Sequence, residues 1–183
     1  MLQDLVKLIV DSYVAPRSAV RRVIDRAQNW EDIAIVFGLS FTLSAMVMTL
    51  RLDDPGDGGL ALILVNLLVS AIGLLLLSFI ATGVGKLFGG KGELKELTAA
   101  MAWHSLVTVV FAPFLSPAAL LATEEARSGF FLQVALLLVV IWLMVNFIAE
   151  AHRFQSAWKV AGVMAALIFL PAILMSFFFA GSM

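Results

Sequence analysis

The chain has 183 residues, of which 62% are hydrophobic and 14% are charged, and its mean hydropathy is +1.02. This composition excludes a water-soluble domain of such a length and indicates a membrane protein. The absence of cysteine excludes disulfides, thiolate catalysis and sulfur-ligated metals, while the net charge of −1 says little, because the position of each charge matters more than the sum in a membrane protein.

The first 30 residues are predicted to form a cytoplasmic amphipathic helical segment, domain 1–30. Apolar side chains recur there at three- and four-residue spacing on both sides of Pro16, which stands at a natural helix start. Two interpretations remain open: the apolar stripe lies in the cytoplasmic headgroup layer, or it packs on the protein's own bundle. Charged residues interrupt the first apolar pattern, so we expect no cleavable signal peptide.

The remainder, residues 31–183, is predicted to be a bundle of transmembrane helices. Five apolar segments reach the length of about 20 residues that a helix needs to cross ~30 Å of hydrocarbon. These segments are residues 33–50, 59–88, 94–122, 130–151 and 157–180. They are too long for barrel strands and do not alternate in polarity, so the expected fold is an all-α polytopic membrane protein with five transmembrane helices. Pro113 and Pro117 should kink or interrupt the third of them, and Pro171 the fifth.

The lysines and arginines predict the orientation of the bundle. Ten of the 12 lie in the N-terminal segment, the second loop and the fourth loop, whereas Arg51 and Arg127 are the single basic residues of the other two loops. By the positive-inside rule, the N-terminus is cytoplasmic and the C-terminus lies outside. Nine of the ten are candidate contacts for anionic lipid headgroups: Arg17, Arg21, Arg22, Arg26, Lys86, Lys91, Lys95, Arg153 and Lys159.

The second loop contains a stretch, "GKLFGGKGEL" at residues 85–94, that matches part of the Walker phosphate-binding pattern. A working Walker loop follows a buried strand and ends in Ser or Thr, which holds magnesium. Here a membrane span precedes the loop, and Gly92 follows Lys91. We therefore expect a cytoplasmic turn between two antiparallel helices, not a nucleotide site.

Few polar side chains lie inside the predicted spans. His104 and Thr108 share a face of the third span, and Asn146 and Glu150 share a face of the fourth. Antiparallel packing would place His104 and Asn146 at a similar depth, where a hydrogen bond between them is geometrically available. Two roles remain open: a polar contact that holds the helices together, or a polar intramembrane site of these four residues that binds an ion, a lipid headgroup or a proton.

The sequence predicts no catalytic chemistry. No nucleophile has a recognisable paired base, two histidines are too few for a dedicated transition-metal site, and no basic surface interleaved with aromatic residues supports nucleic-acid binding. We expect no enzyme activity, no cofactor and no metal. Pairs of small residues four apart in the spans favour close helix packing, so the expected partners are membrane lipids, a second copy of the chain or other membrane proteins.

Three stretches carry a family resemblance: "APRSAVRRVI" in the N-terminal segment, "GKLFGGKGELKELTAAMAW" in the second loop and "AEAHRFQSAWKVAGVMAAL" in the fourth. With the five spans, they resemble the bacterial branch of the Yip family, the Ypt- and Rab-interacting membrane proteins. Eukaryotic relatives bind prenylated Rab-type GTPases, but the short N-terminus, with Asp11 to Tyr13 followed by Val14, departs from their Asp-Leu-Tyr-Gly-Pro element.

The resemblance implies a non-enzymatic scaffold that organises the membrane or binds a partner. Its expected location is the bacterial cytoplasmic (inner) membrane, with the C-terminus in the periplasm. The alternative is a small-solute, ion or lipid transporter or channel with a polar site around His104, Asn146 and Glu150.

Overall fold

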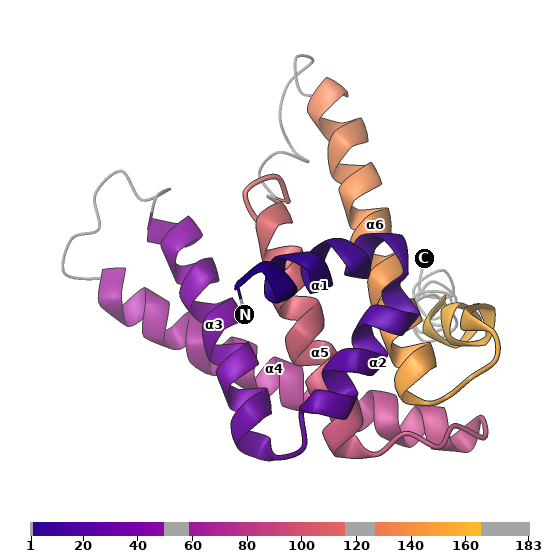
Figure 1. Ribbon diagram of the computed structural model, residues 1–183. Helices are drawn as coiled ribbons and strands as arrows, with labels where there is room; N and C mark the ends of the chain where they lie inside the picture. The colour runs from indigo at the N-terminus through magenta and orange to yellow at the C-terminus, as the bar shows by residue number, and fades with distance from the viewer. Residues whose placement is uncertain (1, 50–58, 116–126, 166–183) are drawn as a thin grey trace, which may run out of the picture.

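The computed structural model describes residues 2–49, 59–115 and 127–165, and all its regular elements within these ranges are helical (Figure 1). The all-α prediction is therefore confirmed for the described residues. The elements are α1 (Leu2–Val14), α2 (Pro16–Arg26), α3 (Trp30–Thr49), α4 (Gly59–Leu87), α5 (Leu94–Thr108), the 3-10 turn η1 (Val109–Phe111) and α6 (Arg127–Ala151). Residues 157–165 are also helical.

Three of the five predicted spans correspond to helices that are long and apolar enough to cross a membrane: Trp30–Val47, Ala61–Leu87 and Phe130–Ala151. Large apolar side chains cover their outer faces, and Leu68 and Phe79 of α4 are more than 60% exposed. Such surfaces are stable only in a hydrocarbon environment, so the chain is an integral membrane protein. The remainder of the predicted third span from residue 116, and of the fifth from residue 166, lies outside the described residues.

Helix α5 occupies the centre of the bundle, where α2, α3, α4 and α6 contact it. Its buried surface includes three alanines, and Ala99, Ala100 and Ala102 are all at most 2% exposed. Small side chains allow neighbouring backbones to approach closely, which is the main source of attraction between helices when lipid is equally apolar.

Helix α5 ends shortly before Pro113, as the sequence predicts. A proline ring clashes with the carbonyl group four residues earlier, which here belongs to Val109. The chain tightens into η1 at this point, and the carbonyl oxygen of Val109 accepts a hydrogen bond from the N–H of Ala112 at 3.1 Å. Within the described residues, the α-helical part of the predicted third span is consequently 15 residues long.

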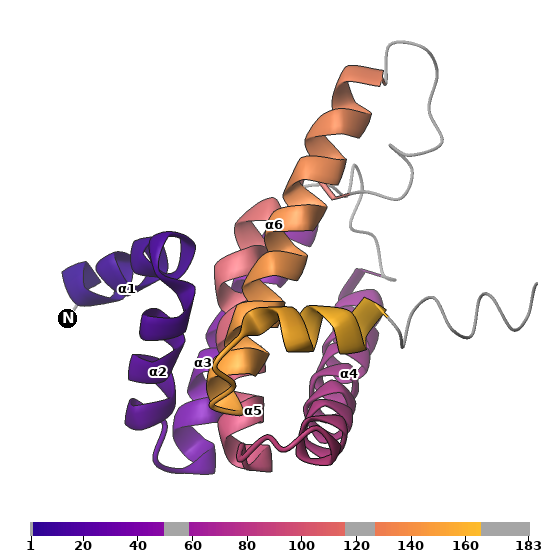
Figure 2. The ribbon, with the colours of Figure 1, turned by 90° about the vertical axis from the view of Figure 1, so that its right-hand side faces the viewer.

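Helices α1 and α2 lie along one side of the bundle (Figure 2). Pro16 begins α2, as expected, and the apolar stripe of α2 is buried: Ala19, Val20, Val23 and Ile24. Because α2 contacts α5 and α6, the structure supports the second interpretation of this stripe, packing on the protein's own bundle. Helix α1 differs, since Val6, Val10 and Val14 are more than half exposed.

Two contacts dock the end of α1 onto α5. The indole N–H of Trp103 donates a hydrogen bond to Oγ of the fully buried Ser12 at 2.9 Å, and the Tyr13 hydroxyl donates to the carbonyl oxygen of Val107. Tyr13 also packs edge-on against Phe111, with ring centroids 5.8 Å apart. These polar groups have their hydrogen-bond partners within the protein, so the end of α1 packs as part of the folded bundle.

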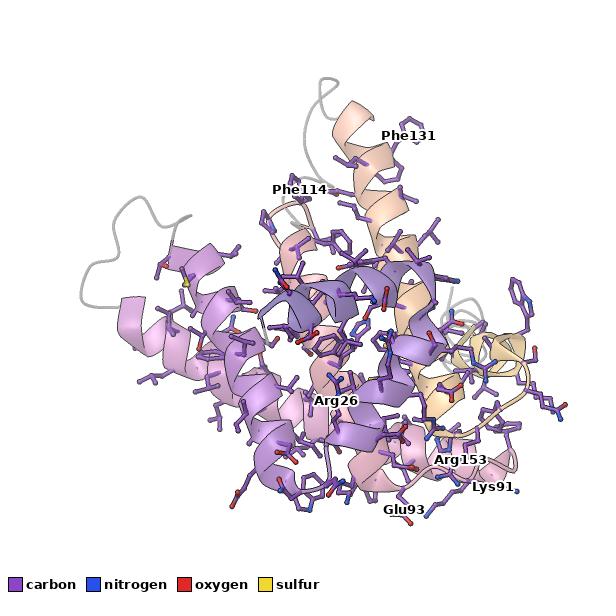
Figure 3. All side chains as sticks on the ribbon, in the orientation of Figure 1. Arg26, Lys91, Glu93, Phe114, Phe131 and Arg153 are labelled. Carbon is purple, nitrogen blue, oxygen red and sulfur yellow. The ribbon has the colours of Figure 1, made fainter. Side chains whose placement is uncertain are left out.

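Most of the charged side chains gather at one end of the bundle. Figure 3 shows Arg26, Lys91, Glu93 and Arg153 at this end, which we call the basic end, and Phe114 and Phe131 at the opposite end. The ends of α2, α4 and α6 and the starts of α3 and α5 meet at the basic end (Figure 1).

Candidate functional site

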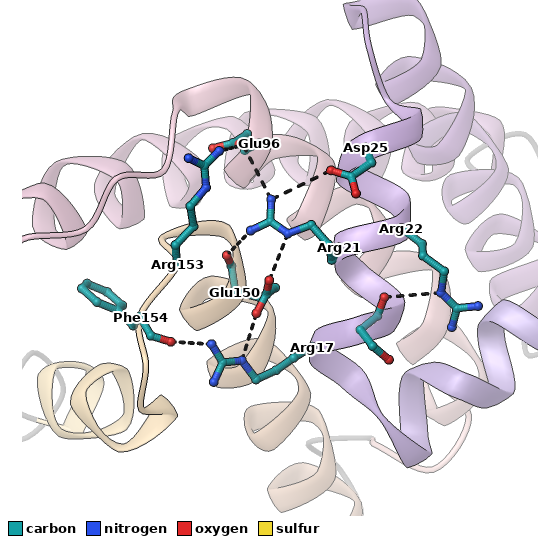
Figure 4. Close-up of polar contacts among 9 residues, drawn as sticks. Arg17, Arg21, Arg22, Asp25, Glu96, Glu150, Arg153 and Phe154 are labelled. Atoms are coloured by element: carbon teal, nitrogen blue, oxygen red, sulfur yellow. Dashed lines mark hydrogen bonds and ion pairs between the residues drawn. The ribbon is translucent and has the colours of Figure 1, made fainter.

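A network of ion pairs at the basic end centres on Glu150, in the last turn of α6. Arg17 and Arg21, one turn apart on α2, each place Nε 3.0 Å from a different oxygen of the Glu150 carboxylate (Figure 4). Arg21 also donates from Nη2 to the carbonyl oxygen of Glu150 at 2.9 Å. A guanidinium group suits this task because it is planar and carries five donors.

A second carboxylate, Glu96 in the first turn of α5, extends the network. Arg153 places Nη2 3.0 Å from Oε1 of Glu96, and Nη1 of Arg21 lies 3.9 Å from the same oxygen. The other oxygen of Glu96 accepts a hydrogen bond from the N–H of Glu93, which completes a capping box at the start of α5. The network, defined as Arg17, Arg21, Glu96, Glu150 and Arg153, thus joins α2, α5 and α6.

The turn after α6 is held in the same way. Arg17 donates from Nη1 to the carbonyl oxygen of Gln155 at 3.1 Å and from Nη2 to that of Phe154. Carbonyl groups beyond a helix end lack helical partners, and cationic side chains stabilise that end through the helix dipole. Arg153 has a left-handed backbone, with φ of 58°, a conformation that non-glycine residues adopt only where the surroundings enforce it.

Gly85 near the end of α4 and the glycine-rich loop after α4 enclose the imidazole ring of His152, the residue that follows α6. A Cβ atom on Gly85 would overlap the ring, one on Gly90 would lie 2.5 Å from Nδ1, and one on Gly92 would lie 2.7 Å from the carbonyl oxygen of Ala151. Gly89 has a positive φ of 83°. The glycines therefore permit close packing of the backbone around His152.

Both ring nitrogens of His152 have backbone partners. Nε2–H donates to the carbonyl oxygen of Ala81 at 2.9 Å, and Nδ1 accepts from the N–H of Gly92 at 3.2 Å, a pattern that only the neutral ring satisfies. His152 is 1% exposed. Burial lowers the pKa of this imidazole, an effect that the Ala81 hydrogen bond and Glu96 oppose and Lys86 reinforces.

The four residues of the predicted intramembrane site are not brought into a single cluster. Glu150 belongs to the network, and Asn146 donates from Nδ2 to the carbonyl oxygen of Trp142 at 2.8 Å. Nε2 of His104 lies 3.1 Å from the carbonyl oxygen of Val140, so His104 does connect α5 to α6, but through the backbone of α6. Thr108 donates back to the carbonyl oxygen of His104 at 2.7 Å.

A separate polar cavity opens between α3, α4 and α5. Thr108 lines it together with Ser40, Ser44, Asn66 and Ser70. The hydroxyl groups of Thr108 and Ser70 have hydrogen-bond partners on their own helices. Groups of three or more His, Cys, Asp or Glu side chains suited to a metal are absent from the described ranges.

The nine predicted headgroup contacts fall into two groups. Five have partners within the protein: Arg17 and Arg21 on Glu150, Arg22 on Asp11 at 2.6 Å, Arg153 on Glu96, and Lys95 on the carbonyl oxygen of Gln28 at 2.8 Å. The other four form no ion pair or side-chain hydrogen bond with any residue that the structure describes: Arg26, Lys86, Lys91 and Lys159. All four are exposed.

Sequence reasoning missed Glu96 and the role of His152. The spacing of Glu93 and Glu96 directly after a glycine-rich turn is a capping-box signal and could have drawn attention to Glu96. No local signal pointed to His152, because its glycine partners lie about sixty residues earlier in the chain.

A protein-family model described as Yip1 domain matches residues 10–179 of the chain. This range includes α2 to α6, the network and the glycine-rich loop. Neither the curated proteins nor the solved structures contain a match.

Proposed function

Because the chain belongs to the Yip1 domain family, we propose that it is a non-enzymatic scaffold that organises the membrane through its basic end. The proposal includes five membrane spans, a cytoplasmic N-terminus and a location in the bacterial cytoplasmic membrane with the C-terminus in the periplasm. Its partners would be anionic lipids and, through its apolar faces, a second copy of the chain or other membrane proteins.

One observation carries this proposal: the division of the nine basic residues into two groups. The arginines of the network hold α2 against α5 and α6, and thereby make the basic end a fixed surface. Arg26, Lys86, Lys91 and Lys159 then remain available on that surface, where each can contribute about 1 kcal/mol of attraction to an anionic membrane.

Two tryptophan side chains support a membrane boundary at the basic end. Trp30 at the start of α3 is 52% exposed and Trp158 in the helix of residues 157–165 is 84% exposed. Tryptophan is enriched at the headgroup level, since its ring is apolar and its N–H is polar. Both side chains lie near the ends of apolar helices where we expect the cytoplasmic interface.

The transport alternative receives less support. Glu150 is neutralised by two arginines, and His104 and Asn146 bond to separate carbonyl groups of α6, so the contacts of these three side chains do not point to a shared polar site. Proteoliposomes that carry wild type or His104→Ala provide the comparison: solute flux that the substitution abolishes would favour a transporter.

The proposed surface is tested with the full chain in vesicles that contain spin-labelled phosphatidylglycerol or phosphatidylcholine. We expect the wild type to immobilise more phosphatidylglycerol, and a variant with glutamine at Arg26, Lys86, Lys91 and Lys159 to lose this preference. Arg22→Gln with Lys95→Gln serves as the control, because both side chains have internal partners. Equal immobilisation of the two lipids by the wild type would refute the proposal.

A further inference from the structure

An apolar groove runs between α4 and the helix of residues 157–165, and it ends at the basic end of the bundle. Leu77, Val84 and Phe88 form one wall, and Val160, Val163 and Met164 form the other. The groove is open to its surroundings along part of its length. Of the described residues that line it, Lys159 is the only one with a charged side chain.

The positive charge lies at one end of this groove. Lys159 belongs to the first turn of the helix of residues 157–165, and Lys86 follows Gly85, a lining residue near the end of α4. Lys86 acts electrostatically on His152, whose ring packs against the lining residue Phe154 at a centroid distance of 5.4 Å. Neither lysine has an acidic partner among the residues that the structure describes.

The floor of the groove is fixed by the contacts around His152. The imidazole joins Ala81, which lines the groove, to Gly92 in the glycine-rich loop. The lining residue Phe154 is also fixed, because its carbonyl oxygen accepts a hydrogen bond from Arg17 of the network. The groove is therefore bordered by elements that the protein already holds in place, a condition for selective binding.

We propose that this groove binds one anionic phospholipid, with a fatty-acyl chain between α4 and the helix of residues 157–165 and the phosphate between Lys86 and Lys159. The chemistry of the walls matches the two halves of such a molecule: apolar side chains along the length and unpaired ammonium groups at the end that faces the headgroup layer. Basic pockets between membrane helices on the cytoplasmic side recognise anionic headgroups in this way.

The inference rests on the proposed function, since it assigns a defined lipid site to part of the basic end. The lipid site differs from the general basic surface in one respect, because it requires Lys86 and Lys159 to act together with the groove. Lys86 directly follows the lining residue Gly85, whereas Arg26 and Lys91, which belong to the same surface, neither line the groove nor adjoin a residue that does, and they should contribute only general attraction.

The experiment uses the full chain in vesicles that contain phosphatidylglycerol or phosphatidylcholine with a diazirine in the fatty-acyl chain. After irradiation, mass spectrometry maps the adducts. We expect groove residues such as Phe88 and Met164 to carry roughly five- to thirtyfold more adduct from phosphatidylglycerol than from phosphatidylcholine. Lys86→Gln with Lys159→Gln should abolish this preference, whereas Arg26→Gln with Lys91→Gln, which removes the same charge, should preserve it.

Three results would overturn the inference. Equal labelling of the groove by both lipids would show annular contact alone, and an equal effect of the two double variants would show attraction by the whole surface. A groove that neither lipid labels, while other outward faces are labelled, would mean that residues 166–183 or a second copy fill it. The spin-label preference for phosphatidylglycerol could survive any of these results, so failure of the groove is distinguishable from failure of the proposed function.

Discussion

Glu150 illustrates how a residue of a membrane helix acquires partners that its local sequence does not reveal. Its side chain is 19% exposed and lies between two guanidinium groups at 3.0 Å each. The sequence places Glu150 one turn from Asn146, which suggested a shared polar site within the membrane. The structure pairs Glu150 with α2 instead, because packing of the α2 apolar stripe brings Arg17 and Arg21 to the end of α6.

Replacement of this carboxylate should weaken the bundle. Glu150→Gln leaves two partly buried arginines without their counter-charge, so we expect the free energy of unfolding to fall by about 1–3 kcal/mol. Unfolding in detergent, followed by circular dichroism, measures the change. Glu31→Gln is the matched control, since Glu31 is exposed in the first turn of α3. An effect no larger than that of the control would show that the network does not hold α2 in place.

The buried imidazole of His152 should make stability depend on pH. Burial lowers its pKa in the folded protein, so the folded state resists protonation more than the unfolded state, whose histidine titrates near 6.5. The stabilising contribution is fully present above about pH 6.5 and is lost as the pH falls through the lower folded-state pKa. Protonation would also place a hydrogen on Nδ1, opposite the N–H of Gly92.

The measurement compares the pH dependence of unfolding in wild type and His152→Asn between pH 7.5 and 5, a range chosen around the value of about 6.5 for an exposed histidine. We expect the variant to be less stable at neutral pH and to lose less stability on acidification. Two parallel curves would contradict the assignment of His152 as a buried neutral group, since His104 and the carboxylates are common to both proteins.

At the scale of elements, the glycine-rich loop shows why a motif can be recognised correctly and still acquire an unforeseen role. The residue after Lys91 is not Ser or Thr, and this argued against a nucleotide site. The expected turn between α4 and α5 is present. Its glycines, however, are required because the imidazole ring of His152, which follows α6, packs against them. These residues lie about sixty positions apart in the sequence, so their contact depends on how the helices pack.

Two glycines on α4 provide a direct test of this packing. Gly85→Ala would force a methyl group into the imidazole of His152 and should lower the free energy of unfolding by about 1–3 kcal/mol. Gly83→Ala meets no atom within 4 Å and should leave stability unchanged or raise it by up to about 1 kcal/mol, because alanine is the better helix former. Equal effects in thermal unfolding would rule out the close approach of Gly85 in α4 to His152.

The N-terminal helices show the limit of periodicity as a predictor. Spacing alone identified the apolar stripe of α2 and the start at Pro16. Spacing could not show whether the stripe lies against lipid or against protein, because both are apolar. For the end of α1, the hydrogen bonds of Ser12 and Tyr13 to α5 show that this part of the helix packs against protein.

For the whole molecule, the strongest predictions come from composition and segment length. The apolar segments around α3, α4 and α6 were located to within a few residues, because about 20 apolar residues have few alternatives to a membrane helix. The third segment behaves differently: its helix is buried in the centre, and Pro113 shortens it. The count of five spans and the placement of each loop remain predictions that depend on the distribution of lysine and arginine.

The most direct test of this account is the side of the membrane on which Lys91 lies, because the basic end must face the cytoplasm for every proposed role. The chain contains no cysteine, so Lys91→Cys creates a single reactive thiol. Glu124→Cys, in the predicted third loop, serves as the external reference. In intact cells, a membrane-impermeant maleimide should label the cysteine at 124 and reach the one at 91 only after the membrane is permeabilised. Labelling at 91 in intact cells would contradict the orientation and the lipid-binding surface derived from it.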